Sequence, residues 1–277
     1  MSDAPNAAQS TYWNETAGPT WAAMQSPLDR QLEPLGRAAM AALALRPGEQ
    51  VIDIGCGAGA TTLQLAAIVA PGGGVTGLDI SATLLALARS RSEGVEGVKF
   101  LEADAQTYRF QPASFDALFS RFGVMFFADP AAAFANLRGA LKPDGRLAFV
   151  CWRRPDENPI MTLPMAAALA HLPPPPPPEP GSPGPFAFAD PDRVRGILGD
   201  AGFRDVVLTP HDEKVGGGDL DMALELALKV GPLGALLREH PDKRDTVIGA
   251  VRDVLAAHEG PDGVKLGSAT WIVTAWA

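Results

Sequence analysis

A glycine-rich turn preceded by an acidic residue carries the chemistry that the sequence suggests most directly. Gly55, Gly57 and Gly59 follow the apolar run Val51-Ile52-Asp53-Ile54, and an apolar pattern with helical spacing begins directly after them. Glycine lets a ligand approach the backbone closely, and the first N–H groups of a helix have no partner within the helix. The carboxylate of Asp53 is expected to reach the mouth of the turn, where it suits a cation or hydroxyl groups better than a phosphate. The sequence therefore predicts a strand, a tight turn and a helix that form a nucleotide-type pocket.

A second acid stands where a ribose would be bound. The run Val75-Thr76-Gly77-Leu78-Asp79 predicts a strand that ends in a carboxylate, and Ser81 is a suitable N-cap for the following helix. Asp79 follows Gly55 by 24 residues, close to the spacing at which such an acid meets a ribose diol. The run Gly55-Cys56-Gly57-Ala58-Gly59-Ala60 also satisfies the G-x-G-x-x-A pattern of NAD-binding proteins. These residues alone therefore do not separate a nicotinamide cofactor from another nucleotide.

The bulk composition favours a small-molecule partner. A formal net charge of -9 and a pI near 4.9 argue against nucleic acid, because phosphate neutralisation needs clustered Lys and Arg. Cys56 and Cys151 are the only cysteines, so no disulfide framework is expected and a reducing compartment fits. The sequence contains no apolar run of about 18 residues and no signal-peptide pattern. We expect a cytoplasmic protein without an integral membrane segment.

The elements that must position the acids alternate as in a doubly wound α/β fold. A helix over residues 28–43 is expected to pack beside the first strand, and residues 1–10 are expected to lack regular structure. Residues 142–145 predict a turn, as do residues 216–219. The expected strands cover residues 51–54, 75–79, 98–101, 115–120, 146–150, 203–215 and 269–276, and further core helices are expected over 59–70, from Ser81, over 131–141 and over 192–201.

The remaining segments divide the chain into a core and two insertions. Six consecutive prolines, 173–178, predict an extended spacer, with a proline-recognition ligand for another protein as the alternative. The insertions are expected to form a cap over the carboxyl ends of the strands. The expected divisions are an N-terminal arm and lid helix (1–46), a core (47–152), a Pro-rich insertion (153–190), a core continuation (191–218), a helical cap insertion (219–262) and a final core strand (263–277).

A wider set of motifs resembles class I S-adenosylmethionine-dependent methyltransferases, most closely the small-molecule branch (methyltransferase type 11) typified by ubiquinone/menaquinone C-methyltransferases. The resemblance covers residues 45–152 strongly, and 190–215 and 268–277 weakly. It implies an α/β fold with a doubly wound, seven-stranded, mostly parallel sheet, Rossmann-like, whose last strand runs antiparallel beside strand five, together with a helical cap. The motifs are Asp53-x-Gly55-x-Gly57-x-Gly59, Asp79 closing strand two, Glu102-Ala103-Asp104-Ala105 after strand three and Leu141 to Leu147 before strand five.

The resemblance also implies S-adenosyl-L-methionine as the cofactor and a role for each motif residue. It implies that Asp53 and the backbone of Gly55, Cys56 and Gly57 hold the methionine portion, and that Asp79, with Ile80 beside it, binds the ribose hydroxyls. It also implies that Asp104 and Ala105 contact the adenine and that Ser120 borders the methionine amine. Acidic residues near a sulfonium and an ammonium avoid the repulsion that a basic site would create.

Methyl transfer by in-line displacement depends mainly on how the acceptor is held. The expected pocket walls are Tyr12, Trp13, Trp21, Phe122 and Trp152, whereas Phe126 is expected in the core. Arg121, at the end of strand four, is a candidate for contacting an anionic acceptor, and His211 is the best placed histidine for a general base. Asp156-Glu157-Asn158 faintly resembles a motif of the metal-using catechol-type O-methyltransferases. Those enzymes place an acid at the end of the fourth strand, where this chain has Ser120-Arg121, so no metal is expected.

Three functions remain open from the sequence. The first is a methyltransferase that acts on a small, apolar or aromatic molecule, with the cap supplying specificity. The second is an NAD-dependent oxidoreductase, which Asp53 and the turn before strand five disfavour. The third is a non-catalytic S-adenosylmethionine-binding protein that uses the proline run and the cap to bind a partner.

Overall fold

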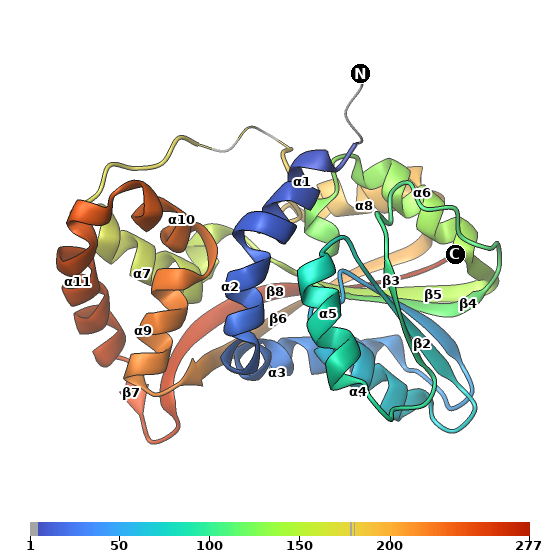
Figure 1. The fold of residues 1–277 in the computed structure, drawn as a ribbon. Coiled ribbons are helices and arrows are strands. Elements are labelled where there is room, and N and C mark those ends of the chain that lie inside the picture. The colour runs from blue at the N-terminus through green and yellow to red at the C-terminus, as the bar shows by residue number, and fades with distance from the viewer. Residues whose placement is uncertain (1–4, 178, 180) are drawn as a thin grey trace.

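The computed structural model describes residues 5–177, 179 and 181–277, and a mixed β-sheet runs through them (Figure 1). Within these residues, seven strands follow the order β3-β2-β1-β4-β5-β8-β6, and the short β7 (Glu259–Gly260) pairs with β8 beside this path. The five strands from β3 to β5 in this order are parallel to one another, whereas β8 is antiparallel to β5 and β6. The predicted sheet with its antiparallel last strand is confirmed. The seven strands are β1 (Gln50–Ile54), β2 (Gly74–Asp79), β3 (Val98–Glu102), β4 (Phe115–Arg121), β5 (Leu141–Trp152), β6 (Arg204–Gly218) and β8 (Gly263–Trp276).

Strands β2 and β3 are added on one side of β1, and β4 and β5 on the other. This reversal of strand order between β1 and β4 creates the crevice where ligands bind in open α/β sheets. Four of the five residues of β1 are buried, because helices cover both faces of this part of the sheet. The helices α3 and α4 lie on one side of the sheet, and α6 and α8 pack together on the other (Figure 1). The core helices are α3 (Gln25–Leu43), α4 (Ala60–Val69), α5 (Ala82–Arg91), α6 (Pro130–Ala140) and α8 (Pro191–Asp200).

The helix α3 does not pack beside the first strand, as the sequence led us to expect. It packs mainly against β4, β5, β6 and β8. The reason is that α4 already covers β1 and β2, while the insertion of β8 between β5 and β6 creates a wide apolar surface further along the sheet. This placement brings the first half of α3 close to the carboxyl ends of the strands.

A second group of helices forms a bundle at one end of the molecule (Figure 1). These helices are α7 (Pro159–Leu169), α9 (Leu220–Lys229), α10 (Gly231–Glu239) and α11 (Arg244–Ala256). We call this bundle the cap. The cap has its own cluster of buried apolar side chains, which includes Val264 and Leu266 of β8. Strands β6 and β8 are therefore long because they extend out of the core and into the cap.

Two predicted turns lie within strands instead. Residues 142–145 belong to β5, where the register against β4 shifts between Phe115 and Ala117. Residues 216–218 belong to β6, where Gly218 pairs with Val264 of β8 after a register shift that follows Val215, and only Asp219 acts as a boundary by capping α9. In both places the residues that predict a turn form an irregular stretch within a longer strand, because pairing with the neighbouring strand resumes on the far side of them.

The N-terminal arm is ordered where the sequence predicted no regular structure. Residues 7–10 are helical, within α1 (Ala7–Thr11), and are followed by the π-helical turn η1 (Tyr12–Thr16) and by α2 (Gly18–Ala23). Residues 1–4 lie outside the described residues. Long-range hydrogen bonds of Asn6 and Asn14 hold the arm on the core, so tertiary contacts override weak local propensity.

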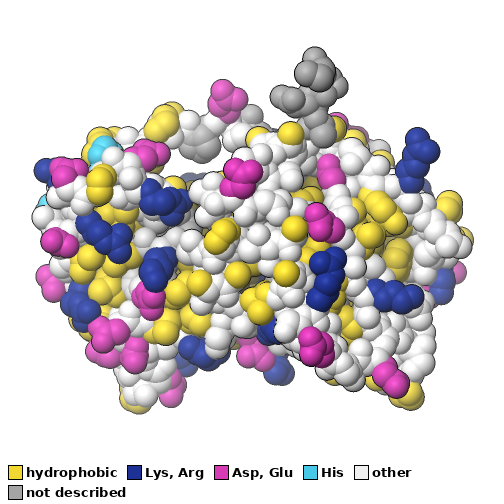
Figure 2. Space-filling model, in the orientation of Figure 1, with side chains coloured by type: hydrophobic (Ala, Val, Ile, Leu, Met, Phe, Trp, Pro, Cys, Tyr) yellow, Lys and Arg dark blue, Asp and Glu magenta, His cyan; other side chains and the backbone are white. Residues whose placement is uncertain are grey.

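The proline run is extended where it is described. Residues 173–177 have no helix or strand and expose their side chains, whereas Pro178 lies outside the described residues. Among the described helices, none is both long and apolar enough to span a bilayer. On the face shown in Figure 2, Lys and Arg alternate with Asp and Glu rather than forming a continuous basic patch.

Candidate active site

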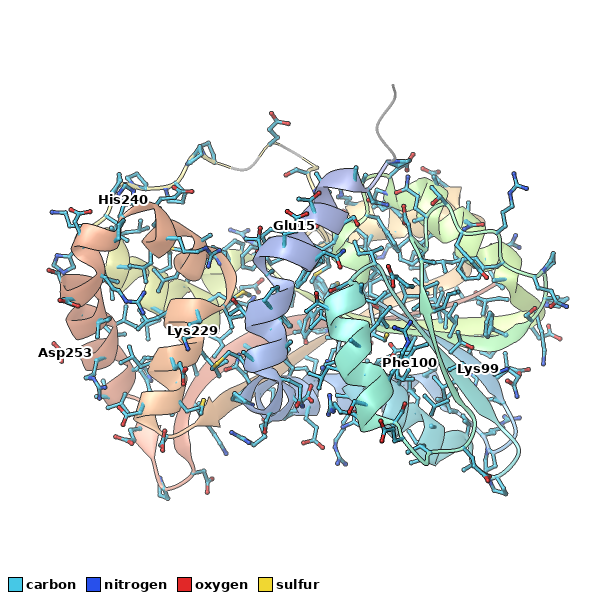
Figure 3. The ribbon with its side chains drawn as sticks, in the orientation of Figure 1. Glu15, Lys99, Phe100, Lys229, His240 and Asp253 are labelled. Atoms are coloured by element: carbon cyan, nitrogen blue, oxygen red, sulfur yellow. The ribbon has the colours of Figure 1, made fainter. Side chains whose placement is uncertain are left out.

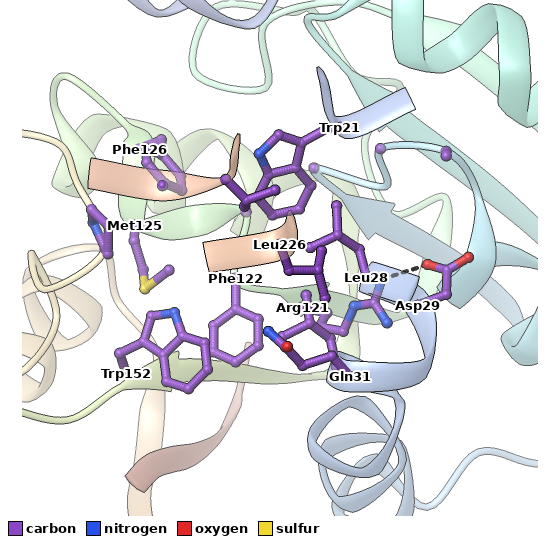
Figure 4. Close-up of a pocket in the computed structure, with 18 of the residues that line it drawn as sticks. Trp21, Leu28, Asp29, Gln31, Arg121, Phe122, Met125, Phe126, Trp152 and Leu226 are labelled. Atoms are coloured by element: carbon purple, nitrogen blue, oxygen red, sulfur yellow. Dashed lines mark hydrogen bonds and ion pairs between the residues drawn. The ribbon is translucent and has the colours of Figure 1, made fainter. Parts of the chain in front are cut away.

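A cavity of about 300 Å³ lies where the carboxyl ends of the core strands meet the arm and the cap (Figure 4). One part of its wall is the glycine turn with Asp79, Ile80, Asp104 and Ala105. Another part is aromatic and aliphatic and includes side chains of α3, the segment after β4 and the cap. The two parts belong to one continuous space, so a ligand on the glycine turn and a second ligand against the apolar wall would be in contact.

The glycine turn adopts a backbone that requires glycine. Gly55, Gly57 and Gly59 have φ values of 67°, 53° and 80°. A Cβ atom on Gly55 would lie 2.7 Å from the Cα atom of Gly123, so the two backbones approach too closely for any side chain. Gly59 is the N-cap of α4. The predicted strand, turn and helix are present, with the first N–H groups of α4 at the turn.

Asp53 lies behind the turn, and not at its mouth as expected. Its side chain is fully buried, and its Oδ2 atom accepts hydrogen bonds from the hydroxyls of Thr61 and Thr62, both at 2.7 Å. Burial raises the pKa of Asp53 to about 6, although both hydroxyls and the nearby Arg121 charge oppose this rise. Asp53 does not line the cavity, so it supports the turn from below by fixing the first turn of α4.

Asp79 faces the cavity from the end of β2. Its Oδ2 accepts from the backbone N–H of Gly57 at 2.8 Å, and its Oδ1 accepts from that of Ser81 at 2.9 Å. Each carboxylate oxygen can accept a further hydrogen bond, so both remain available to hydroxyl groups. Burial raises the pKa of Asp79 above its ordinary value, and the backbone hydrogen bonds counteract this. Ser81 also caps α5, as predicted.

Asp104 is held by a residue that sequence reasoning missed. The side-chain amide of Asn6 donates to both carboxylate oxygens of Asp104, at 3.0 and 2.9 Å, and its oxygen accepts from the N–H of Ala128 at 2.8 Å. Both Asn6 and Asp104 line the cavity. A single asparagine in a polar N-terminal segment carries no signal for such a contact, because its partners lie about 100 residues away in the chain.

Ser120 is buried and does not line the cavity. Its hydroxyl donates to the carbonyl of Ile54 at 2.8 Å and accepts from the N–H of Gly123 at 3.1 Å. Ser120 therefore ties the end of β4 to the glycine turn, and this contact keeps Gly55 and Gly123 together.

Aromatic side chains form much of the apolar wall. Of the expected wall residues, Trp13, Trp21, Phe122 and Trp152 line the cavity, whereas Tyr12 does not. Phe122 stacks on Trp152 with ring centroids 4.2 Å apart, and Trp13 packs edge-on against Trp21. Phe126, which was expected in the core, both packs against the core and lines the cavity. The short helix η2 (Val124–Phe126) explains this dual position, because it turns successive side chains toward different surroundings.

Arg121 lines the cavity and His211 does not. The Nη2 atom of Arg121 lies 3.3 Å from the Oδ1 atom of Asp29 on α3, and Arg91 binds the same carboxylate at 2.9 Å. His211 lies on β6 opposite Thr270, away from the cavity, so the structure gives it no place as a base there. The wall residues that sequence reasoning missed include Gln25, Leu28, Asp29, Gln31 and Leu32 of α3, and Met165 and Leu226 of the cap.

The missed residues of α3 had a weak signal in the sequence. Leu28 and Leu32 follow the helical pattern that was used to place the helix, and the polar residues beside them would line the same edge. The cap residues had no such signal, because which face of a cap helix covers the cavity depends on how the bundle docks.

The sheet order and the glycine turn define a class I S-adenosylmethionine-dependent methyltransferase fold. In sequence, residues 52–149 match the family described as a methyltransferase domain. Over 103 residues the chain is 33% identical to demethylmenaquinone methyltransferase of Staphylococcus aureus, a match that covers 37% of this chain and 43% of that enzyme. The match thus spans less than half of the length of this curated relative.

Solved structures share the fold over most of the chain. The YcgJ protein of Bacillus subtilis superposes with a TM-score of 0.57 at 17% identity, covering 88% of this chain and 97% of that protein. Phosphoethanolamine N-methyltransferase 2 of Haemonchus contortus, solved in complex with S-adenosyl-L-methionine, gives a TM-score of 0.54 at 19% identity and covers 88% of this chain and 52% of that one. At these identities the likeness is one of fold.

Proposed function

We propose that this protein transfers a methyl group from S-adenosyl-L-methionine to a small, apolar or aromatic molecule. The observation that carries the proposal is the single cavity that has the glycine turn and acids on one side and aromatic and aliphatic side chains on the other. Such a cavity suits one polar nucleotide ligand and one apolar ligand in contact with it. The match of residues 52–149 to a methyltransferase domain supports the same reaction.

The residues on the polar side fit the cofactor. Asp79 offers two carboxylate oxygens to the ribose hydroxyls, and such charge-assisted hydrogen bonds are strong. Asp104 and the backbone of Ala105 offer polar contacts for the adenine. The backbone of the glycine turn can approach the methionine portion closely, since Gly55 and Gly57 leave no side chain in the way.

When bound, S-adenosylmethionine supplies an electrophilic methyl group on a sulfonium. The acceptor atom uses its lone pair to form the new bond to the methyl carbon, and the broken carbon–sulfur bond leaves its electron pair on sulfur. The contribution of this chain is to hold the two molecules in line and to exclude water. Phe122, Trp152 and Trp21 form flat apolar surfaces suited to orienting an aromatic acceptor, and aromatic faces also stabilise a nearby cation.

The cavity wall favours an acceptor that is already nucleophilic. Among the described residues that line it, there is no histidine, lysine, tyrosine or glutamate. Asp29, the carboxylate nearest to Arg121, is already bound by two arginines. A phenolate, an enolate or a neutral amine would react without a strong general base, and these acceptors fit the site best.

Calorimetric titration of the purified protein with S-adenosylmethionine, S-adenosylhomocysteine and NAD in parallel tests the cofactor. We expect the two sulfur nucleotides to bind and NAD not to bind. An acceptor screen with phenols, quinols and amines then follows methyl transfer by mass spectrometry. Binding of NAD alone would overturn the proposal in favour of an oxidoreductase, and tight cofactor binding without transfer to any acceptor would favour a non-catalytic role.

A further inference from the structure

The cavity contains a buried cationic group with unused hydrogen-bonding capacity. The side chain of Arg121 is only 12% exposed, and its Nη1 atom is buried without a hydrogen-bond partner. Among the described residues that line the cavity, no other side chain has a fully buried nitrogen or oxygen without a partner. Leaving a charged donor buried and unpaired is costly, so such a group calls for an explanation, and a ligand is the direct one.

The surrounding structure makes room for this guanidinium on the cavity side. Gly36 of α3 faces the side chain, and a Cβ atom at this position would lie 3.1 Å from the Cδ atom of Arg121. Figure 4 shows the guanidinium joined to Asp29, and Gln31, Phe122 and Leu28 line the same cavity. Arg121 therefore reaches along α3 into the cavity.

Two carboxylates and a second arginine lie near Arg121. Asp29 is shared between Arg121 and Arg91, and the buried Asp53, whose pKa the charge of Arg121 lowers, is the other carboxylate near Arg121. Arg91 also donates to the carbonyl of Ala58 at 2.6 Å, which leaves Arg121 as the cation with a free donor. The case for a ligand therefore rests on the buried, unpaired Nη1 donor of Arg121 and not on a surplus of positive charge.

We propose that Arg121 binds a carboxylate inside the cavity and so selects ligands that carry one. The planar guanidinium can pair Nη2 with Asp29 while Nη1 donates to the ligand. Two sources present this group next to the glycine turn: the methionine carboxylate of the cofactor and a carboxylate on the acceptor. The identity of these ligands rests on the proposed function, whereas the anion site rests on Arg121 itself.

The first arm of the test isolates the cofactor as the source. S-adenosylmethionine and decarboxylated S-adenosylmethionine, which lacks only the carboxylate, are titrated calorimetrically into the wild type and into Arg121→Met. If Arg121 binds the cofactor carboxylate, the wild type prefers S-adenosylmethionine by about tenfold or more, and the variant loses most of this preference.

The second arm isolates the acceptor as the source. 2-Naphthoate and its uncharged analogue 2-naphthamide are titrated with and without saturating S-adenosylhomocysteine, and quenching of the tryptophans in the wall reports binding. If the acceptor supplies the carboxylate, the wild type prefers naphthoate by about tenfold, and Arg121→Met abolishes the preference.

Two variants keep the result interpretable. Arg121→Lys retains a positive charge and should keep part of the preference, whereas Arg37→Met removes an exposed arginine from the same helix as Asp29 and should keep all of it. Thermal melts verify that each variant is folded. The inference would be overturned if the wild type showed no preference for the carboxylate ligand in either arm. It would also be overturned if folded Arg121→Met kept the preference. Failure of every sulfur nucleotide to bind would refute the proposed function instead, and the naphthoate arm without nucleotide would still test Arg121.

Discussion

Three carboxylates surround the glycine turn, and their environments give them different tasks. Asp53 is buried beneath the turn and is bonded to two threonines. Asp79 faces the cavity and is fixed by backbone N–H groups. Asp104 also faces the cavity but is bonded to Asn6 of the arm. Asp79 is therefore the acid best prepared to bind a ligand, because backbone N–H groups rather than another side chain fix its orientation.

Asp79→Ala should weaken binding of S-adenosylmethionine by about 1.5 to 3 kcal/mol, the scale of losing hydrogen bonds to a charged group. Calorimetric titration of the wild type and the variant measures the change. Because Asp79 also accepts from Gly57 and Ser81, circular dichroism must first show that the variant is folded. Unchanged affinity in a folded variant would contradict the assignment of Asp79 to the ribose.

Asp53 should make stability depend on pH. Its pKa is raised from the ordinary 3.8 to about 6, so the native state holds this proton over a range where the unfolded chain has released it. The contribution of Asp53 to the free energy of unfolding is therefore present at low pH and is lost as pH rises through this window. Relative to Asp53→Asn, the wild type should lose about 1 to 3 kcal/mol between pH 4 and pH 7.

Denaturant unfolding of both proteins at the two pH values measures this difference, and the comparison cancels the other titrating groups that they share. A difference that stays constant with pH would show that the burial of Asp53 does not perturb its titration.

At the scale of elements, the N-terminal arm is fastened to the loops that border the cofactor side of the cavity. Asn14 donates to the carbonyl of Ile80 at 3.0 Å and accepts from the N–H of Ala82 at 2.9 Å. Ser81 donates its hydroxyl to the carbonyl of Trp13 at 2.8 Å. The arm thus covers the end of β2, and a ligand bound at Asp79 would lie beneath it.

Asn14→Ala should loosen the arm by about 1 to 2 kcal/mol, because two hydrogen bonds to the core are lost. Hydrogen exchange of amides in residues 7–24, followed by mass spectrometry, should accelerate by about tenfold, while exchange in β1 and β4 should not change. Glu15→Ala is the matched control, since this neighbouring side chain is exposed (Figure 3). Equal exchange in both variants would show that Asn14 does not fasten the arm.

At the scale of the whole molecule, the two sides of the cavity depend on different hydrophobic cores. The glycine turn and Asp79 rest on the main core, which spans the sheet. The cap helices share a separate cluster, in which Val247 and Val251 of α11 are fully buried. Leu226 of the cap packs against Met24 and Leu28 and so connects the cap to the N-terminal part of the chain. Damage to the cap core should therefore affect the acceptor side more than the cofactor side.

Val247→Asp should disrupt the cap while the protein still binds S-adenosylhomocysteine, since burying an unpaired charge costs several kcal/mol within that cluster. Calorimetry should give an affinity for S-adenosylhomocysteine within about threefold of the wild type, while methyl transfer is lost. Asp253→Asn, at an exposed position of the same helix, is the control (Figure 3). Loss of both binding and transfer would mean that the cap and the core fold as one unit.

The sequence by itself predicted the strands, the glycine turn and the position of Asp79 at the end of the second strand. Short-range rules govern these features: apolar runs form buried strands, and a turn with positive φ requires glycine. The order of the strands and the expected role of Asp104 followed instead from the resemblance to a methyltransferase family. Parallel strands then bring their carboxyl ends to one edge, so residues at those ends meet.

Only the tertiary structure decided which residues of α3 and of the cap complete the apolar wall, and that the arm is ordered. The contacts of Asn6 with Asp104, of Arg121 with Asp29 and of Leu226 with Leu28 join segments far apart in the chain. Their formation depends on how α3, the arm and the cap dock, and docking follows from packing over whole surfaces rather than from any local pattern. Asp53 lies beneath the turn rather than at its mouth for a local reason, because two threonines at the start of α4 bind its carboxylate.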